Sequence, residues 1–289
     1  MAKVTQRCHQ ATGRTTFICD FSPPRSGDPV VLRQAGIDAD FISVAYNPGR
    51  AVRVNPAMLA AAIKQHTGRD VSFTLATRDM NRLALQSQLL GAQLLGVENV
   101  VVVQGDPFTE RDLALVKPAG DITSTGLIEA IAGMNQGVDF RGSRLRAPTG
   151  FCTGATVDLV RGVRDEAELA RGKVLAGAQF LITQPIFDVE DAARFRDAYA
   201  GAAGEPLAIP VFFGLQVLEP EGIIFSSVPE SVRQELARGR SGVDIALELC
   251  RRFQESGLHD IYLVPPIRRG GARDYPAAQE VLTGVRRIC

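Results

Sequence analysis

Several residue types are scarce or missing in this chain of 289 residues. It has no tryptophan, three histidines and five cysteines, and the cysteines form no CxxC pair or Cys/His spacing typical of a zinc site. Lys plus Arg and Asp plus Glu both number 32, so the net charge of zero does not indicate a nucleic-acid or anionic-membrane partner. The odd number and wide spacing of the cysteines indicate reduced thiols, as expected in the cytoplasm.

Targeting and nucleotide-binding motifs are missing as well. Residues 1–14 are polar and contain no apolar signal core, and no apolar stretch is long enough to cross a bilayer. The chain has no GxGxxG phosphate loop, no P-loop and no GxSxG nucleophile elbow. We therefore expect one cytoplasmic domain over residues 1–289, with residues 1–14 as a polar N-terminal extension. Composition leaves a monomer and a homo-oligomer both open.

What the chain does contain is a series of eight short apolar runs at near-constant intervals. Helical segments separate them, and Met80–Leu95 shows the clearest helical spacing of leucines. Eight βα units in a chain of this length favour an α/β fold with a single closed (β/α)8 TIM barrel over a doubly wound open sheet. The runs are Thr16–Cys19, Phe41–Val44, Val71–Leu75, Val100–Val103, Phe151–Thr153, Phe180–Ile182, Val211–Gly214 and Ile261–Val264.

Polar and small residues follow these runs, at the strand ends where barrel enzymes place their active sites. Asp20 is either a general acid or a turn residue, and the sequence does not decide between them. Gly105-Asp106 allows a ligand to approach the backbone closely, or it forms an ordinary turn. Small residues at Thr153-Gly154 leave room for a flat ring, or simply pack tightly.

Three further strand ends carry candidate ligand contacts. Arg78 either holds a phosphate or carboxylate or pairs with Asp79, which we expect to cap the following helix. Tyr46 and Asn47 contact a ligand or form an Asx turn. The amide of Gln184 offers two donors and one acceptor, which suits the edge of a pterin or flavin, although a satisfied rim residue is the alternative.

Taken together, these motifs resemble the methylenetetrahydrofolate reductase family. The matching pieces occur in the same order along nearly the whole chain, and each of them alone is weak. The most specific piece is Ala176–Pro185, which ends in Ile-Thr-Gln-Pro. The other pieces are Cys19–Arg25, Thr77–Asn81, Val103–Pro107, Leu127–Gly137, Phe151–Ala155, Phe212–Gly214 and Ile261–Pro266.

The resemblance implies a folate-dependent oxidoreductase of one-carbon metabolism that binds FAD. Hydride passes from NADH or NADPH through the flavin to 5,10-methylenetetrahydrofolate and gives 5-methyltetrahydrofolate, or the reaction runs in reverse. The resemblance places the family's acid at Asp20 and the pterin-contacting glutamine at Gln184. It also places Asp106 near the flavin and the folate. The implied cofactor contacts are Tyr46, Asn47, Thr74, Arg78, Gln104, Gly105, Asp106, Thr153, Gly154 and Lys173.

The chain departs from the family pattern at some of these positions. Asp20 stands where the family usually has glutamate, and Thr74 stands where it often has histidine. Some relatives pass hydride directly from the nicotinamide, without flavin. Two alternatives therefore stay open. The first is a flavin-independent reductase on the same barrel, and the second is a non-catalytic folate- or flavin-binding subunit that partners a methyltransferase or another redox subunit.

Overall fold

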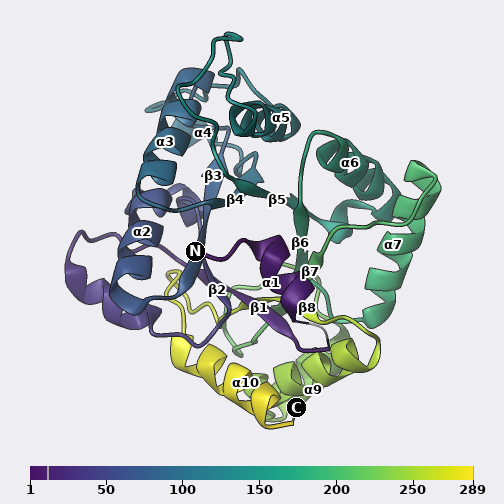
Figure 1. The fold of residues 1–289 in the computed structure, drawn as a ribbon. Coiled ribbons are helices and arrows are strands. Elements are labelled where there is room, and N and C mark those ends of the chain that lie inside the picture. Colours follow the sequence, from purple (N-terminus) through teal and green to yellow (C-terminus); the bar gives the residue numbers. More distant parts are fainter. Residues whose placement is uncertain (12, 289) are drawn as a thin grey trace.

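The computed structural model describes residues 1–11 and 13–288, so Thr12 and Cys289 lie outside the described part. Within it, eight parallel strands pair in sequence order and close into a barrel, with β8 beside β1 (Figure 1). This confirms the predicted (β/α)8 fold. The strands are β1 (Thr16–Phe21), β2 (Phe41–Val44), β3 (Asp70–Ala76), β4 (Asn99–Val103), β5 (Cys152–Val157), β6 (Phe180–Pro185), β7 (Val211–Gln216) and β8 (Asp260–Val264).

Helices surround the barrel, and none in the described part is long and apolar enough to span a bilayer. The α-helices are α1 (Val4–Gln10), α2 (Pro56–Thr67), α3 (Arg82–Leu94), α4 (Glu110–Leu113), α5 (Ser124–Asn135), α6 (Val163–Leu175), α7 (Val189–Ala203), α8 (Glu230–Ala237), α9 (Gly242–Glu255) and α10 (Tyr275–Ile288). Three 3-10 helices, η1 (Pro29–Ala35), η2 (Pro48–Arg50) and η3 (Leu159–Arg161), lie in loops. The long fourth and seventh units each contain two helices, α4 with α5 and α8 with α9.

The start of α3 differs from the expectation. Its N-cap is Asn81, whose side-chain oxygen accepts a hydrogen bond from the amide of Ala84 at 2.9 Å. The prediction that Asp79 caps this helix is wrong. The reason is that both carboxylate oxygens of Asp79 accept hydrogen bonds from Arg78, so the carboxylate faces the neighbouring guanidinium.

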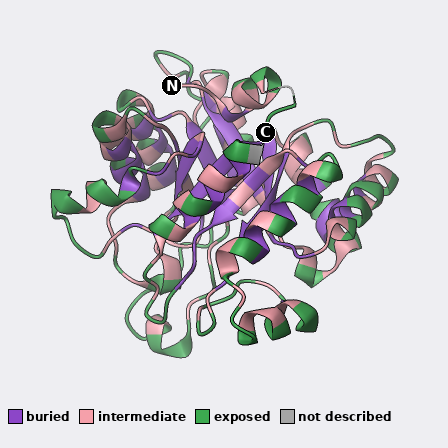
Figure 2. Cartoon of the chain, turned by 90° about the horizontal axis from the view of Figure 1, so that it is seen from below, coloured by how far each residue is buried: buried purple, intermediate pink, exposed green. Residues whose placement is uncertain are grey.

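Two apolar layers follow from the alternation of side chains along each strand. One layer lies between the strands and the outer helices and contains strand residues such as Phe73 and Leu215. The other fills the barrel interior and gathers Ile18, Phe41 and Phe180 from different strands. Figure 2 shows the buried strands at the centre and exposed faces on the outer helices. Alternate residues near the C-terminal strand ends therefore face the interior at the mouth of the barrel.

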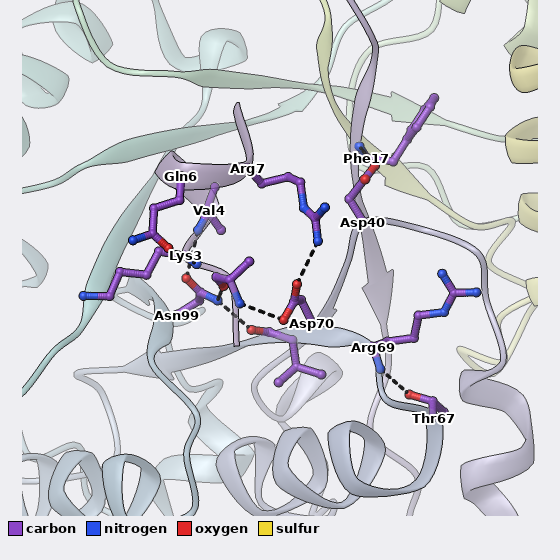
Figure 3. Close-up of polar contacts among 12 residues, drawn as sticks. Lys3, Val4, Gln6, Arg7, Phe17, Asp40, Thr67, Arg69, Asp70 and Asn99 are labelled. Atoms are coloured by element: carbon purple, nitrogen blue, oxygen red, sulfur yellow. Dashed lines mark hydrogen bonds and ion pairs between the residues drawn. The ribbon is translucent and has the colours of Figure 1, made fainter. Parts of the chain in front are cut away.

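Helix α1 lies across the N-terminal opening of the barrel (Figure 1), a helix that the polar pattern of residues 1–14 did not indicate. Val4 is fully buried and packs with the interior layer. Asn99 holds this segment in place (Figure 3): its Oδ1 accepts from the amide of Val4 at 3.1 Å, and its Nδ2 donates to the carbonyls of Ala2 and Val71, each at 3.0 Å. The first residues thus close the barrel floor.

Asn99→Ala is expected to lower the free energy of unfolding by about 2–3 kcal/mol, because it removes three buried hydrogen bonds and leaves their backbone partners unsatisfied. Urea denaturation of both proteins measures this difference. Gln6→Ala is the matched control, since Gln6 accepts an exposed hydrogen bond in the same helix and its loss should change stability little. Equal effects of the two substitutions would contradict the role of Asn99 in holding the first residues in place.

Candidate active site

Asp20 forms the centre of the polar site at the barrel mouth. It lies near the end of β1, is 4% exposed, and shares its strand face with the interior residue Ile18. Its Oδ1 accepts a hydrogen bond from the hydroxyl of Tyr262 at 3.0 Å, and its Oδ2 accepts from Nε of Arg273 at 3.0 Å. The side chains of Asp20 and Arg273 are 6% and 4% exposed, so their ion pair is buried.

Arg273, the ion-pair partner of Asp20, was not among the candidate residues indicated by the sequence. It comes from the loop between β8 and α10, where an isolated antiparallel bridge joins it to Ile267. Its guanidinium also donates to the carbonyl of Gly271 at 3.3 Å, and its Cζ lies 5.8 Å from the ring centre of Phe225. The arginine-rich run after β8 was the available signal, but nothing in the sequence shows that this loop turns back toward Asp20.

Two tyrosines complete the wall on this side. Burial, together with the neighbouring Asp20 carboxylate, raises the pKa of Tyr262 well above its ordinary value, so this phenol remains a neutral donor. Burial also raises the pKa of Tyr275. The Tyr275 hydroxyl accepts from the amide of Ser22 at 3.0 Å, and its ring stacks on Phe21 at 4.8 Å. These contacts fix the end of β1, on which Asp20 lies.

A second polar cluster joins the ends of β2, β3 and β4. Nε and Nη2 of Arg78 donate to the two carboxylate oxygens of Asp79 at 2.5 and 2.8 Å, and its Nη1 donates to the carbonyl of Asp106 at 2.6 Å. The guanidinium lies 4.3 Å from the ring centre of Phe108. Of the two roles considered for Arg78, the geometry therefore supports pairing with Asp79. The backbone of Asp106 belongs to the cluster, whereas its side chain is exposed.

Close packing explains the glycine in this cluster. Gly105 has a φ of +88°, and a Cβ there would lie 3.3 Å from Cβ of Arg78. A side chain at this position would therefore be strained and would push against Arg78. Gln104, on its other side, is exposed.

The ionisation of Asp79 gives a testable pH dependence. Burial opposes its ionisation, but hydrogen bonds from Arg78 and Tyr46 lower its pKa below the ordinary value near 3.8. A lowered folded-state pKa stabilises the protein above the unfolded-state pKa, and this contribution is lost as the pH falls through the folded-state value. We therefore expect Asp79→Asn to be less stable than the wild type at pH 7, with the difference shrinking below about pH 4. Urea denaturation at pH 7, 5 and 3 measures this. A difference that is constant with pH would contradict it.

Residues that follow β2 present an unpaired polar atom to the mouth. Asn47 adopts a left-handed conformation with a φ of 36°, and its buried Oδ1 has no hydrogen-bond partner within the described residues. Tyr46 is half-buried and hydrogen-bonds to Asp79, and burial raises its pKa. Other buried oxygens without partners lie on the loops after β1 and β7, namely Ser22 Oγ, Glu219 Oε2 and Ser226 Oγ. Such atoms are typical of a site that receives a ligand or water.

The end of β6 approaches the end of β7 unusually closely. A Cβ on Gly214 would lie 2.6 Å from the backbone of Gln184 and Pro185, where the register between the two strands shifts. Gln184 lies two residues after Ile182, which packs in the barrel interior, and its side chain is half-buried. It lies near the end of β6, on a strand separate from that of Asp20.

Strand β5 is longer than predicted and moves two expected residues away from the mouth. Thr153 and Gly154 lie in the first half of β5, which runs to Val157, and the ring of Phe180 occupies the space beside Gly154, where a Cβ would come within 2.3 Å. The backbone amide of Thr153 is also engaged within the protein, because it donates to Oε1 of Gln179 at 3.1 Å. The room foreseen for a flat ring at Gly154 is filled by the protein itself.

Residues higher on β5 are closer to the mouth. Nζ of Lys173, on α6, donates to the carbonyl of Thr156 at 2.7 Å, and burial lowers its pKa. Thr74 lies in β3 between the outward-facing residues Phe73 and Leu75, so its half-buried side chain faces the interior.

A cavity of about 520 Å³ lies at the opposite, N-terminal end of the barrel. Ion pairs line it, including Arg7 with Asp70 at 3.1 Å (Figure 3). Another joins Arg14 to Asp40 at 2.7 Å. Its arginines already have aspartate partners, and this end of a barrel usually serves stability rather than catalysis. We therefore place the active site at the C-terminal mouth, around Asp20. No cluster of His, Cys, Asp or Glu in the described residues is arranged to hold a metal ion.

Fold and site together define a (β/α)8-barrel protein with a buried carboxylate–arginine pair at the C-terminal ends of its strands. A family model described as methylenetetrahydrofolate reductase matches residues 3–265. The chain therefore belongs to the methylenetetrahydrofolate reductase family.

Individual relatives are distant. The chain is 26% identical over 202 residues to 5,10-methylenetetrahydrofolate reductase of Pectobacterium carotovorum subsp. carotovorum, covering 67% of this chain and 62% of that protein. It is 21% identical over 268 residues to methylenetetrahydrofolate reductase 1 of Schizosaccharomyces pombe, covering 85% of this chain and 42% of the relative. The matches thus span about two fifths to three fifths of these relatives' lengths.

The fold is also found in a solved structure. An uncharacterized protein from Clostridium thermocellum that binds two copies of 5-methyl-5,6,7,8-tetrahydrofolic acid matches with a TM-score of 0.67 and 13% identity. The match covers 98% of both chains, so the barrel is shared over its full extent.

Proposed function

We propose that this protein is a folate-dependent oxidoreductase that interconverts 5,10-methylenetetrahydrofolate and 5-methyltetrahydrofolate at the C-terminal mouth of its barrel. One observation carries the proposal: Asp20, which falls at the position of the family's acid, is a buried carboxylate at the mouth. Family membership supports the reaction class. The folate-binding neighbour shares the fold over its whole length.

In this proposal, residues on different strands have different tasks. Asp20 lies beside the reacting carbon and ring nitrogens. Gln184 hydrogen-bonds the pterin edge through its amide, which offers donors and an acceptor. Asp106 lies at the rim, with its carbonyl fixed by Arg78 and its carboxylate exposed toward an entering ligand.

The residues implied for FAD do not form a continuous set. Arg78 is engaged by Asp79, Lys173 is engaged by a backbone carbonyl, and Phe180 fills the space beside Gly154. Arg50, near the same loops, pairs with Asp112 at 3.1 Å. The charges of Arg78 and Arg50 are therefore already paired, and the ammonium of Lys173 is directed at a backbone carbonyl, so the three do not gather around an open pyrophosphate site. Of the two routes left open by the sequence, this geometry favours direct hydride transfer from a reduced nicotinamide to folate.

The absorption spectrum of the purified protein, followed by heat release of any chromophore, distinguishes the two routes. We expect a colourless protein that oxidises NADH or NADPH when 5,10-methylenetetrahydrofolate is added. Flavin bands with FAD in the supernatant would instead support the relay through flavin and contradict the direct route.

Folate binding without turnover is the second candidate function, and the buried pairing of both Asp20 oxygens favours it. Calorimetric binding of 5-methyltetrahydrofolate, with no oxidation of NADH or NADPH under any condition tested, would support this role. A cytoplasmic location stays a prediction of the sequence, which leaves the oligomeric state open.

A further inference from the structure

We propose that Arg273 is a positioning residue that keeps Asp20 ionised, so that Asp20 stabilises the cationic form of the folate substrate and does not supply the proton for ring opening. This inference rests on the proposed function. It differs from the role of general acid that the sequence resemblance assigns to Asp20.

Each carboxylate oxygen of Asp20 already accepts a hydrogen bond from a neighbouring side chain. Oδ2 faces the guanidinium of Arg273 at 3.0 Å, and Oδ1 accepts from the hydroxyl of Tyr262 at 3.0 Å. A nearby cation and donated hydrogen bonds both favour the charged form of a carboxylate. Because both side chains are almost fully buried, water screens this attraction little.

The other groups around Asp20 do not compensate the charge of Arg273. Burial raises the pKa values of the neighbouring Tyr262 and Tyr275, and also that of Cys19 on β1, so all three are neutral near pH 7. Ser43 of β2, which lies opposite Asp20 in the strand register, is uncharged. Arg273 is therefore the charged group in contact with the carboxylate.

More positive charge lies behind Arg273. Burial, together with the charges of Arg273 and Arg25, lowers the pKa of Arg53. Arg53 donates to the carbonyls of Pro23 and Pro48 at 2.8 and 3.3 Å, and these neutral partners leave its charge uncompensated.

The reaction balances without a proton from Asp20. The bond between the methylene carbon and the departing ring nitrogen breaks, and its electron pair goes to that nitrogen, which takes a proton from solvent at the open mouth. The remaining iminium cation is stabilised by the Asp20 carboxylate. Hydride, with its electron pair, then moves from the reduced nicotinamide to the methylene carbon, which is reduced while the nicotinamide is oxidised.

The pH profile of kcat/KM for Arg273→Gln tests this role, because the two roles of Asp20 predict changes on opposite limbs. Removing the cation makes ionisation of Asp20 harder. If the carboxylate is the active form, the acidic limb moves about 1–3 units to higher pH, and the variant loses activity at neutral pH but recovers it in base. If Asp20 is the acid, the basic limb moves up instead, and activity extends to higher pH. That second result would overturn the inference.

Matched variants separate this effect from a loss of structure. Arg273→Lys keeps the cation and should restore most of the wild-type profile. Tyr262→Phe removes the other donor and should shift the acidic limb in the same direction by a smaller amount. Arg269→Gln, on the exposed part of the same loop, where Arg269 pairs with Glu221 at 3.4 Å, should leave the profile unchanged.

The experiment also separates the two proposals. Wild-type protein that shows no turnover at any pH would contradict the proposed function. Wild-type turnover combined with an unshifted profile in both folded Arg273→Gln and folded Tyr262→Phe would contradict this inference alone. Thermal melts of every variant establish that the assayed proteins are folded.

Discussion

Asp20→Asn is expected to lower kcat/KM for 5,10-methylenetetrahydrofolate by about 100-fold or more, since it removes the negative charge that stabilises the cationic reaction centre. The measurement is the oxidation of NADH or NADPH at saturating and limiting folate. Binding of 5-methyltetrahydrofolate should weaken much less, because that product carries no iminium charge. Full turnover by Asp20→Asn would show that this carboxylate plays no role in catalysis.

This substitution also leaves Arg273 buried without a counter-ion, which typically costs about 3–5 kcal/mol of stability. Asp20→Asn combined with Arg273→Gln is the control, because two neutral amides in the same space need no counter-ion. We expect the double variant to regain much of the lost stability without regaining turnover. If turnover returned together with stability, the effect of Asp20→Asn would be one of folding.

Gly214→Ala is expected to disturb both stability and folate binding. Its Cβ would meet the backbone of Gln184 and Pro185 at 2.6 Å, and backbone cannot move aside as a flexible side chain does. Overpacking of this kind costs about 1–3 kcal/mol, and relief of the clash displaces Gln184. Loss of one amide hydrogen bond to the pterin corresponds to roughly tenfold weaker binding. Thermal melts and calorimetric titration with 5-methyltetrahydrofolate measure the two effects.

Gly91→Ala provides the matched glycine substitution. Gly91 lies in α3, and a Cβ there would meet nothing within 4 Å. The change should raise stability by about 0.5–1 kcal/mol, because alanine loses less backbone entropy in a helix, and it should leave folate affinity unchanged. Wild-type affinity in Gly214→Ala would contradict the assignment of Gln184 to the pterin.

The barrel could be predicted because its strands are short apolar runs that repeat with helical segments between them. Strand β5 was predicted too short, since Gly154-Ala155-Thr156 lacks the large apolar residues that mark the other strands. Hydrogen-bonded pairing with β6, rather than the side-chain pattern, determines where this strand ends.

The sequence indicated candidate residues at the ends of the apolar runs, as with Asp20 and Gln184, which lie near the ends of β1 and β6. The electrostatics of the site could not be predicted, because Arg273 reaches Asp20 across 253 positions from a loop whose path no periodicity describes. The same limit applies to Arg78 and Asp79, whose two competing roles depend on distances that only the folded chain defines.

The pairing of β1 with β8 brings together residues that lie far apart in the sequence. During synthesis on a ribosome, Asp20 emerges 242 residues before Tyr262 and 253 residues before Arg273. A partly made chain therefore holds a carboxylate that lacks its counter-ion and a sheet that still has two open edges. Under the proposed function, the site is complete only after ring closure, so the onset of turnover in a refolding experiment would time the closing of the barrel itself.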